Sequence, residues 1–210
     1  MVQTIPISEN ITTLNQVQAK FDLRRTENEQ FFTEWFADLP PITDQEQTQL
    51  DRIKHKYVYQ RADGFLTEET IKLVVLSPLL DLAGFYEAPF RFQAETPIEI
   101  AIANQDEVLR GRIDALVVQN QFWVLVIESK RTTLDLEVAI PQALTYMMAN
   151  PHLEKPLFGL VTNGGSFAFI KLAQGEYDLS DIFSLLPRQN KLYEVLSILK
   201  QIGVLISPEG

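Results

Sequence analysis

The sequence predicts a mixed α/β, or α+β, domain in which helices cover a central β-sheet. Apolar residues follow helical spacing in the first third, alternate in the middle of the chain, and then follow helix and strand patterns in turn. The chain has 210 residues, of which 46% are hydrophobic, so it is long enough for one sizeable core. We see no linker that would split it into independent units.

Two helices are expected in the first 66 residues. Thr26 with Glu29, and Thr43 with Glu46, have capping-box spacing, in which side chains bond to the free backbone N–H groups of a helix start. The run Leu39-Pro40-Pro41 separates the two helices. The apolar residues that they would bury are Phe31, Phe32, Trp35 and Phe36, then Leu50, Ile53 and Tyr57.

A third helix is expected to begin after Thr67 as its N-cap and to stop at Gly84, with a kink or break at Pro78. Glu68 and Glu69 fall in its first turn, where carboxylates complement the helix dipole. A structural role and a functional role are both open for this pair.

From residue 86 the pattern alternates, which is typical of strands. Four strands are expected, at 90–92, 98–102, 113–118 and 122–127. Their connections are short, so an antiparallel meander is the simplest arrangement. A helix at 136–149 that contains Pro141, a hairpin with its turn at 163–165, and an amphipathic helix at 189–202 complete the chain.

Two carboxylates are expected to meet on the hairpin around Asn120. A hairpin closed near residues 120 and 121 pairs positions whose numbers sum to about 241 or 242, which sets Asp114 beside or nearly beside Glu128. Alternation then places Glu128 and Lys130 on one side and Ser129 on the other. Val124 and Val126 would share the face of Glu128 and form an apolar floor. A divalent cation would offset the cost of burying this charge, and Mg²⁺ suits oxygen ligands.

This pattern resembles the D...(D/E)-x-K signature of PD-(D/E)XK nucleases. Three further elements are similar to the nuclease domain at the N-terminus of type I restriction enzyme R subunits: the Thr67-Glu68-Glu69-Thr70 helix start, the run 110–114, and Gln142 with Tyr146. The Pro that usually precedes the first Asp is replaced by Ile113. The resemblance spans about 67–172 and implies a restriction-endonuclease-like fold, a central mixed β-sheet flanked by helices, here with an N-terminal helical extension.

The resemblance also implies roles for individual residues. One Mg²⁺ or Mn²⁺ would be held by Asp114, Glu128 and the carbonyl of Ser129, with Glu68 joining them. Lys130 would activate the attacking water, and Gln142 would orient Lys130 or a metal-bound water. The DNA contacts would come from Arg110, Arg112, Arg131 and the Tyr146 phenol.

The site residues also have plain structural interpretations. Asp114, Glu128 and Lys130 could form a solvated salt-bridge cluster at the rim of the sheet, which would contribute little to stability. Gln142 and Tyr146 could be one helix face packing on the sheet. His55 and His152 have no partner at ligand spacing, so zinc is not expected.

The charge bears on the partners. The net charge of -10 argues against a protein that coats nucleic acid through bulk charge. However, residues 1–100 carry 9 basic and 16 acidic side chains and residues 101–210 carry 9 and 12, so the excess acid lies mostly outside the predicted site. We therefore expect weak, metal-assisted and salt-sensitive DNA binding.

These observations favour a magnesium-dependent (endo)deoxyribonuclease of restriction or repair type. The alternative is a catalytically inactive protein of the same fold that serves as a binding or assembly subunit. The chain could pair with a second copy or join a restriction or repair assembly, because it encodes no nucleotide-binding P-loop. Without a signal sequence or an apolar span, a cytoplasmic location and no membrane contact are expected. The expected segments are a helical extension at 1–66, the nuclease core at 67–172 and a helical segment of the same domain at 173–210.

Overall fold

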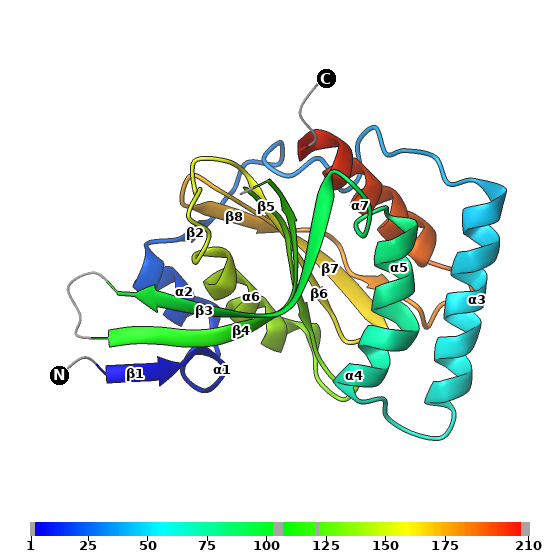
Figure 1. Ribbon diagram of the computed structural model, residues 1–210, viewed down its shortest axis with the longest axis horizontal. Coiled ribbons are helices and arrows are strands. Elements are labelled where there is room, and N and C mark those ends of the chain that lie inside the picture. The colour runs from blue at the N-terminus through cyan, green and yellow to red at the C-terminus, as the bar shows by residue number, and fades with distance from the viewer. Residues whose placement is uncertain (1–2, 103–106, 121, 207–210) are drawn as a thin grey trace.

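One mixed β-sheet organises the protein in the computed structural model, which describes residues 3–102, 107–120 and 122–206 (Figure 1). The strand order is β1-β4-β5-β6-β7-β8-β2, with β3 also beside β4 and β9 beside β7. The strands are β1 Gln3–Pro6, β2 Arg24–Arg25, β3 Phe90–Ala101, β4 Glu107–Gln119, β5 Phe122–Ser129, β6 Leu157–Thr162, β7 Ser166–Ala173, β8 Glu176–Leu179 and β9 Phe183–Ser184.

Helices cover both faces of this sheet. The helices are α1 Ile7–Asn10, α2 Leu14–Phe21, α3 Asp44–Arg61, α4 Glu68–Ile71, α5 Ser77–Leu82, α6 Ala139–Met147 and α7 Leu192–Ile206, with a π-helical turn η1 Lys72–Leu76 and a 3-10 turn η2 Leu136–Val138. One apolar core lies under α3, α4, α5 and α7, and a second lies under α1, α2 and α6. The predicted mixed α/β class, with a central mixed sheet flanked by helices, is confirmed.

The predicted meander is present as the antiparallel neighbours β3, β4 and β5. The two expected strands at 90–92 and 98–102 form one long strand, β3. In the β4–β5 hairpin Ala115 pairs with Ile127, which gives the expected sum of 242. A β-bulge shifts the register by one beyond Val117, and Val124 packs in the core opposite to that of Val126. The prediction that Val124 and Val126 both lie on the Glu128 side of the strand is therefore wrong for Val124.

The helices that follow Thr43 and Thr67 begin where the sequence predicts. Thr43 and Glu46 form a complete capping box, and the Thr67 side chain accepts a hydrogen bond from the backbone N–H of Thr70. Helical structure then runs through α4, η1 and α5. The π-helical turn lies directly before Pro78, because proline has no N–H to continue the regular ladder.

The helix expected to start at Thr26 is absent, and residues 26–43 form turns and irregular structure. The Thr26 hydroxyl accepts from the backbone N–H of Asn28, and the Asn28 side chain accepts from Gln30. These local bonds replace the capping box. Phe32 is buried, as predicted for the aromatic residues of this segment, whereas the prediction is wrong for Phe36, which is exposed.

Short strands at the margins of the sheet were not foreseen. Of the N-terminal helices only α3 was expected, whereas α1 and α2 were not foreseen. The same segment also contributes β1, which runs parallel to β4, and β2, which runs parallel to β8. Strands of two to four residues are too short to show an alternating pattern. Across the described part of the chain, no helix combines the length and apolar character needed to cross a membrane.

Candidate functional site

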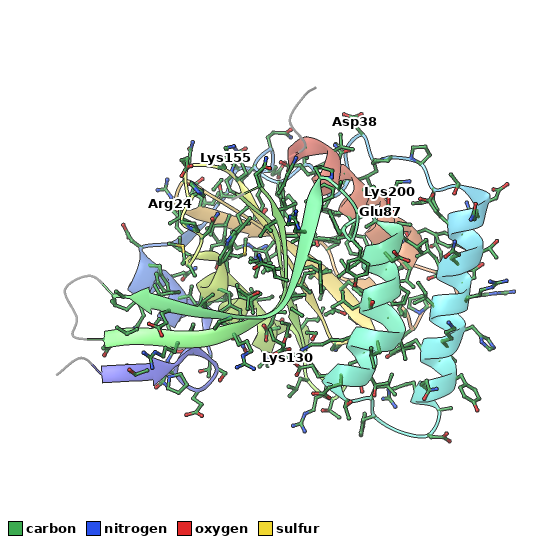
Figure 2. The ribbon with its side chains drawn as sticks, in the orientation of Figure 1. Arg24, Asp38, Glu87, Lys130, Lys155 and Lys200 are labelled. Atoms are coloured by element: carbon green, nitrogen blue, oxygen red, sulfur yellow. The ribbon has the colours of Figure 1, made fainter. Side chains whose placement is uncertain are left out.

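Asp114 and Glu128 meet at the end of the β4–β5 pairing. Ala115 and Ile127 are the last residues paired in register, so Asp114 and Glu128 are the next residues on the two strands. Figure 2 labels Lys130, which follows β5, beside the central strands and near α4. The predicted neighbourhood of the two acids and the lysine is thus present in the structure.

Asp114 is held from two sides. One carboxylate oxygen, Oδ1, accepts a hydrogen bond from Lys72 Nζ at 2.8 Å. The other, Oδ2, accepts from the backbone N–H of Ser129 at 2.7 Å and from its hydroxyl at 2.9 Å. Ser129 was expected to face away from the acids, and this expectation is wrong for its hydroxyl. The contact forms where the strand pairing ends and the Asp114 side chain can reach across to the next residue.

Glu128 is buried, with its side chain 2% exposed. Its Oε1 accepts from Lys130 Nζ, and its Oε2 is buried with no hydrogen-bond partner in the described part of the protein. Burial, with the neighbouring charge of Asp114, raises the pKa of Glu128 to about 8, although Lys130 acts in the opposite direction. A buried carboxylate oxygen without a partner is costly, and a bound cation would remove that cost.

Lys130 is fixed by a chain of hydrogen bonds that leads into α6. Its ammonium donates to Gln142 Oε1 at 2.9 Å, and Gln142 Nε2 donates to the Tyr146 hydroxyl. Gln142 and Tyr146 are four residues apart on α6 and share one face, as predicted. Tyr146 is only 2% exposed, so its predicted contact with the DNA backbone is wrong. The phenol instead holds Gln142, because α6 is packed flat against the sheet.

Glu68 lies near the same acids from the start of α4. Burial and the charge of Asp114 raise the pKa of Glu68, and its Oε1 is 3.6 Å from Lys72 Nζ. Within the residues that the structure describes, no three His, Cys, Asp or Glu side chains are grouped closely enough to hold an ion. Two lysine ammonium groups lie among the carboxylates. Even so, Glu128 Oε2 is buried without a described partner, and the pKa values of Glu68 and Glu128 are raised first by burial and then by the charge of Asp114, so a divalent cation fits this site.

The basic residues that were predicted to contact DNA lie at the protein surface. Arg110 is exposed and pairs with Glu99 at 2.9 Å, and Arg112 is exposed at 3.7 Å from Glu95. Arg131 is exposed directly after Lys130. All three can reach solvent, but the two strand arginines share their charge with acidic neighbours on β3. Their DNA contacts stay predictions.

Gly111 allows Tyr146 to approach β4. A Cβ atom at this glycine would lie 2.7 Å from Tyr146 Cε1 and 3.0 Å from Ile7 Cδ1. We predict that Gly111→Ala destabilises the fold by about 1–3 kcal/mol, because Tyr146, which holds Gln142, must move to admit the added Cβ. Urea unfolding measures this effect. Gly203→Ala is the control, because its Cβ would be 3.4 Å from the nearest atom. Unchanged stability in Gly111→Ala would contradict the packing argument.

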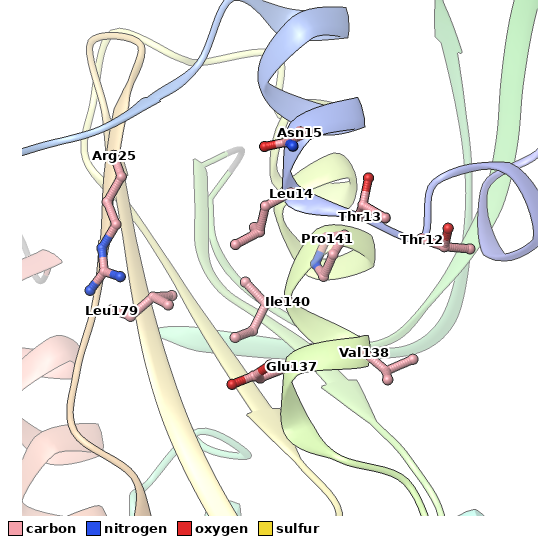
Figure 3. Close-up of a pocket in the computed structure, with 10 residues that line it drawn as sticks. All are labelled: Thr12, Thr13, Leu14, Asn15, Arg25, Glu137, Val138, Ile140, Pro141 and Leu179. Carbon is pink, nitrogen blue, oxygen red and sulfur yellow. The ribbon is translucent and has the colours of Figure 1, made fainter.

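A cavity of about 570 Å³ lies elsewhere, between the start of α2, the η2–α6 turn and β2 (Figure 3). Thr13, Arg25 and Glu137 are among its lining residues, and Arg25 is already paired with Asp178. None of the predicted site residues is among the described residues that line this cavity. We therefore place the candidate chemistry at the strand ends around Asp114 and Glu128.

Comparisons with known proteins give one family. The sequence pattern described as the type I restriction enzyme R protein N terminus matches residues 7–178, which includes α1 to α3 outside the predicted resemblance. A solved fragment of a putative HsdR subunit of a type I restriction enzyme from Vibrio vulnificus YJ016 is similar, with 20% identity and a TM-score of 0.43. The similarity covers 66% of this chain and 26% of that fragment, so the matched part spans about a quarter of the fragment's length. No curated protein matches the chain.

Proposed function

Because this chain belongs to the family of type I restriction enzyme R protein N termini, we propose that it is a PD-(D/E)XK nuclease domain that hydrolyses DNA phosphodiester bonds with Mg²⁺ or Mn²⁺. One observation carries the proposal. Asp114 and Glu128 meet at the strand ends, Lys130 is held between Glu128 and Gln142, and Glu128 Oε2 is buried without a described partner. The mixed sheet with helices on both faces has the arrangement expected of a restriction-endonuclease-like fold.

Asp114, Glu128 and the carbonyl of Ser129 would hold the ion, with Glu68 nearby. When bound, a divalent ion polarises the scissile phosphate and stabilises the negative charge that develops on it. The Lys130 ammonium, fixed by Glu128 and Gln142, is placed to orient the attacking water. That water forms the new P–O bond, and the leaving alkoxide takes up a proton as the old P–O bond breaks. Gln142, held by Tyr146, keeps Lys130 in place.

We also propose that the chain works with partners that bind DNA and drive its translocation, because it belongs to the type I restriction enzyme R family and its sequence encodes no nucleotide-binding P-loop. The charge of -10 supports a need for a more basic partner on DNA. Copurification from the native host, followed by identification of the bound chains, tests this. A chain that is recovered alone and cleaves DNA unaided would contradict it.

The proposed activity is tested by incubating the purified chain with linear, nicked, single-stranded and branched DNA in Mg²⁺ or Mn²⁺. We expect cleavage of at least one form, and loss of cleavage with EDTA. Calorimetric titration with Mn²⁺ provides a second readout, in which binding depends on both Asp114 and Glu128. Intact DNA together with absent Mn²⁺ binding would favour the catalytically inactive binding or assembly subunit.

A further inference from the structure

Lys72 lies in the acidic cluster without a role in the proposed chemistry. It is the first residue of η1, and its ammonium lies 2.8 Å from Asp114 Oδ1, 3.0 Å from Glu95 Oε1 and 3.6 Å from Glu68 Oε1. Its side chain is 25% exposed. Burial lowers the pKa of Lys72, but the hydrogen bond to Asp114 and the charges of Asp114 and Glu95 raise it overall. The ammonium is therefore charged and shared among three carboxylates.

The register of β3 and β4 explains why a cation is needed here. Ala94 pairs with Ala115 and Thr96 pairs with Ile113, so Glu95, which leaves the extended conformation with a φ of 51°, and Asp114 fall between these two pairs on neighbouring strands. Like charges on opposing strand positions repel each other. Lys72 bridges the two carboxylates and supplies the opposite charge. Without a metal ion, the Lys72 ammonium thus neutralises the charge of Asp114, as a bound cation would.

An ammonium and a divalent ion cannot both stay at Asp114 without strong repulsion. Repulsion between two like charges a few ångströms apart is strong near a protein surface, and a divalent ion doubles the repulsion that a single charge would cause. An ion on Asp114 must therefore move Lys72 away or bind weakly.

The structure contains space into which the Lys72 side chain can move. A cavity of about 170 Å³ adjoins it and is lined by Tyr86, Glu95 and Asp114 among others. Glu95 is an exposed residue of this lining, and the Lys72 side chain has four flexible methylene groups. A displaced ammonium can keep its pair with Glu95 while leaving Asp114. Movement toward Glu95 therefore breaks the ion pair with Asp114 and keeps the ion pair with Glu95.

We propose that Lys72 is a built-in counter-cation that competes with the divalent ion for Asp114, and that it retreats to Glu95 when the ion binds. The inference rests on the proposed metal-dependent function. In this role Lys72 is a positioning residue that determines how tightly the site binds the metal ion. The opposite interpretation is that Lys72 only orients Asp114 for the metal. The two differ in sign, because removal of a competitor raises metal affinity, whereas removal of an orienting group lowers it.

Calorimetric titration of the metal-free protein with Mn²⁺ separates the two. We expect Lys72→Met to bind Mn²⁺ about tenfold more tightly or better, and to melt at a lower temperature without metal. Lys200→Met is the matched control, because Lys200 is 27% exposed and also pairs with a carboxylate, that of Glu46 at 2.9 Å. It should leave Mn²⁺ affinity unchanged. If Lys72→Met does not fold, Lys72→Gln replaces it in the same titration.

A second measurement tests the retreat to Glu95. Glu95→Gln should weaken Mn²⁺ binding in the wild-type background, because the displaced ammonium loses its outer partner, and should have little effect in the Lys72→Met background. Glu99→Gln is the control on the same strand. An equal effect of Glu95→Gln in both backgrounds would overturn the retreat.

The outcomes also separate this inference from the proposed function. If wild-type protein binds Mn²⁺ through Asp114 and Glu128, and Lys72→Met binds equally or more weakly, the competition is wrong and the proposed function stands. If only Lys72→Met binds Mn²⁺, competition is supported in its strongest form. If neither protein binds Mn²⁺, both proposals are overturned.

Discussion

Replacing Asp114 with asparagine is expected to abolish DNA cleavage while leaving the chain folded. Asp114 is the acid that the structure connects to both sides of the site, through Lys72 on one oxygen and Ser129 on the other. Asparagine keeps the shape and one acceptor oxygen, so much of this bonding survives. It loses the negative charge that would hold the ion. A divalent ion supplies several kcal/mol of transition-state stabilisation, so the rate should fall about 10³-fold or more.

The measurement is single-turnover cleavage in Mg²⁺ and in Mn²⁺, with thermal unfolding as the check on folding. Asp81→Asn is the matched control, because Asp81 is an exposed carboxylate on α5 outside the cluster. It should cleave at the wild-type rate. If Asp114→Asn retained wild-type cleavage, Asp114 would not be a ligand of the catalytic ion and the proposed mechanism would fail.

The centre of the candidate site could be predicted because it depends on local rules. A tight connection after Gln119 sets β4 against β5 closely enough to bring Asp114 and Glu128 together, although strict two-residue alternation misplaced Val124 and the Ser129 hydroxyl. Spacing of four residues on α6 likewise placed Gln142 and Tyr146 on one face. These relations are encoded within about thirty residues of chain, so they need no knowledge of the rest of the fold.

The parts that were missed depend on contacts between distant segments. The 26–43 loop is held by contacts such as that of Glu34 with Lys171, which lies on β7. Lys72 carried one signal in the sequence, its spacing of four from Glu68, but its contact with Asp114 depends on how α4 and η1 pack against β4. Tyr146 was placed on the correct face, but its burial follows from the whole of α6 being covered.

Replacing Glu128 with glutamine is expected to stabilise the metal-free protein at high pH. The pKa of Glu128 is raised from 4.5 to about 8, so the folded protein holds a proton that the unfolded chain releases. The stability from this group is complete below pH 4.5, falls as the pH rises toward 8, and is lost above 8. At about 1.4 kcal/mol per pH unit, the loss is on the order of 4–5 kcal/mol. Glutamine does not titrate and can still accept from Lys130.

Unfolding by urea at pH 5 and at pH 9, without metal, measures this difference between the two proteins. We expect similar stabilities at pH 5 and a clear advantage for Glu128→Gln at pH 9. Mn²⁺ should remove that advantage by stabilising the wild type only, because the ion takes the place of the proton on Glu128. A wild type whose stability at pH 9 equals that of the variant would mean that Glu128 is ionised without cost, which would remove the main structural reason for a cation at this site. A binding residue that destabilises the empty fold is expected only where a ligand compensates for it.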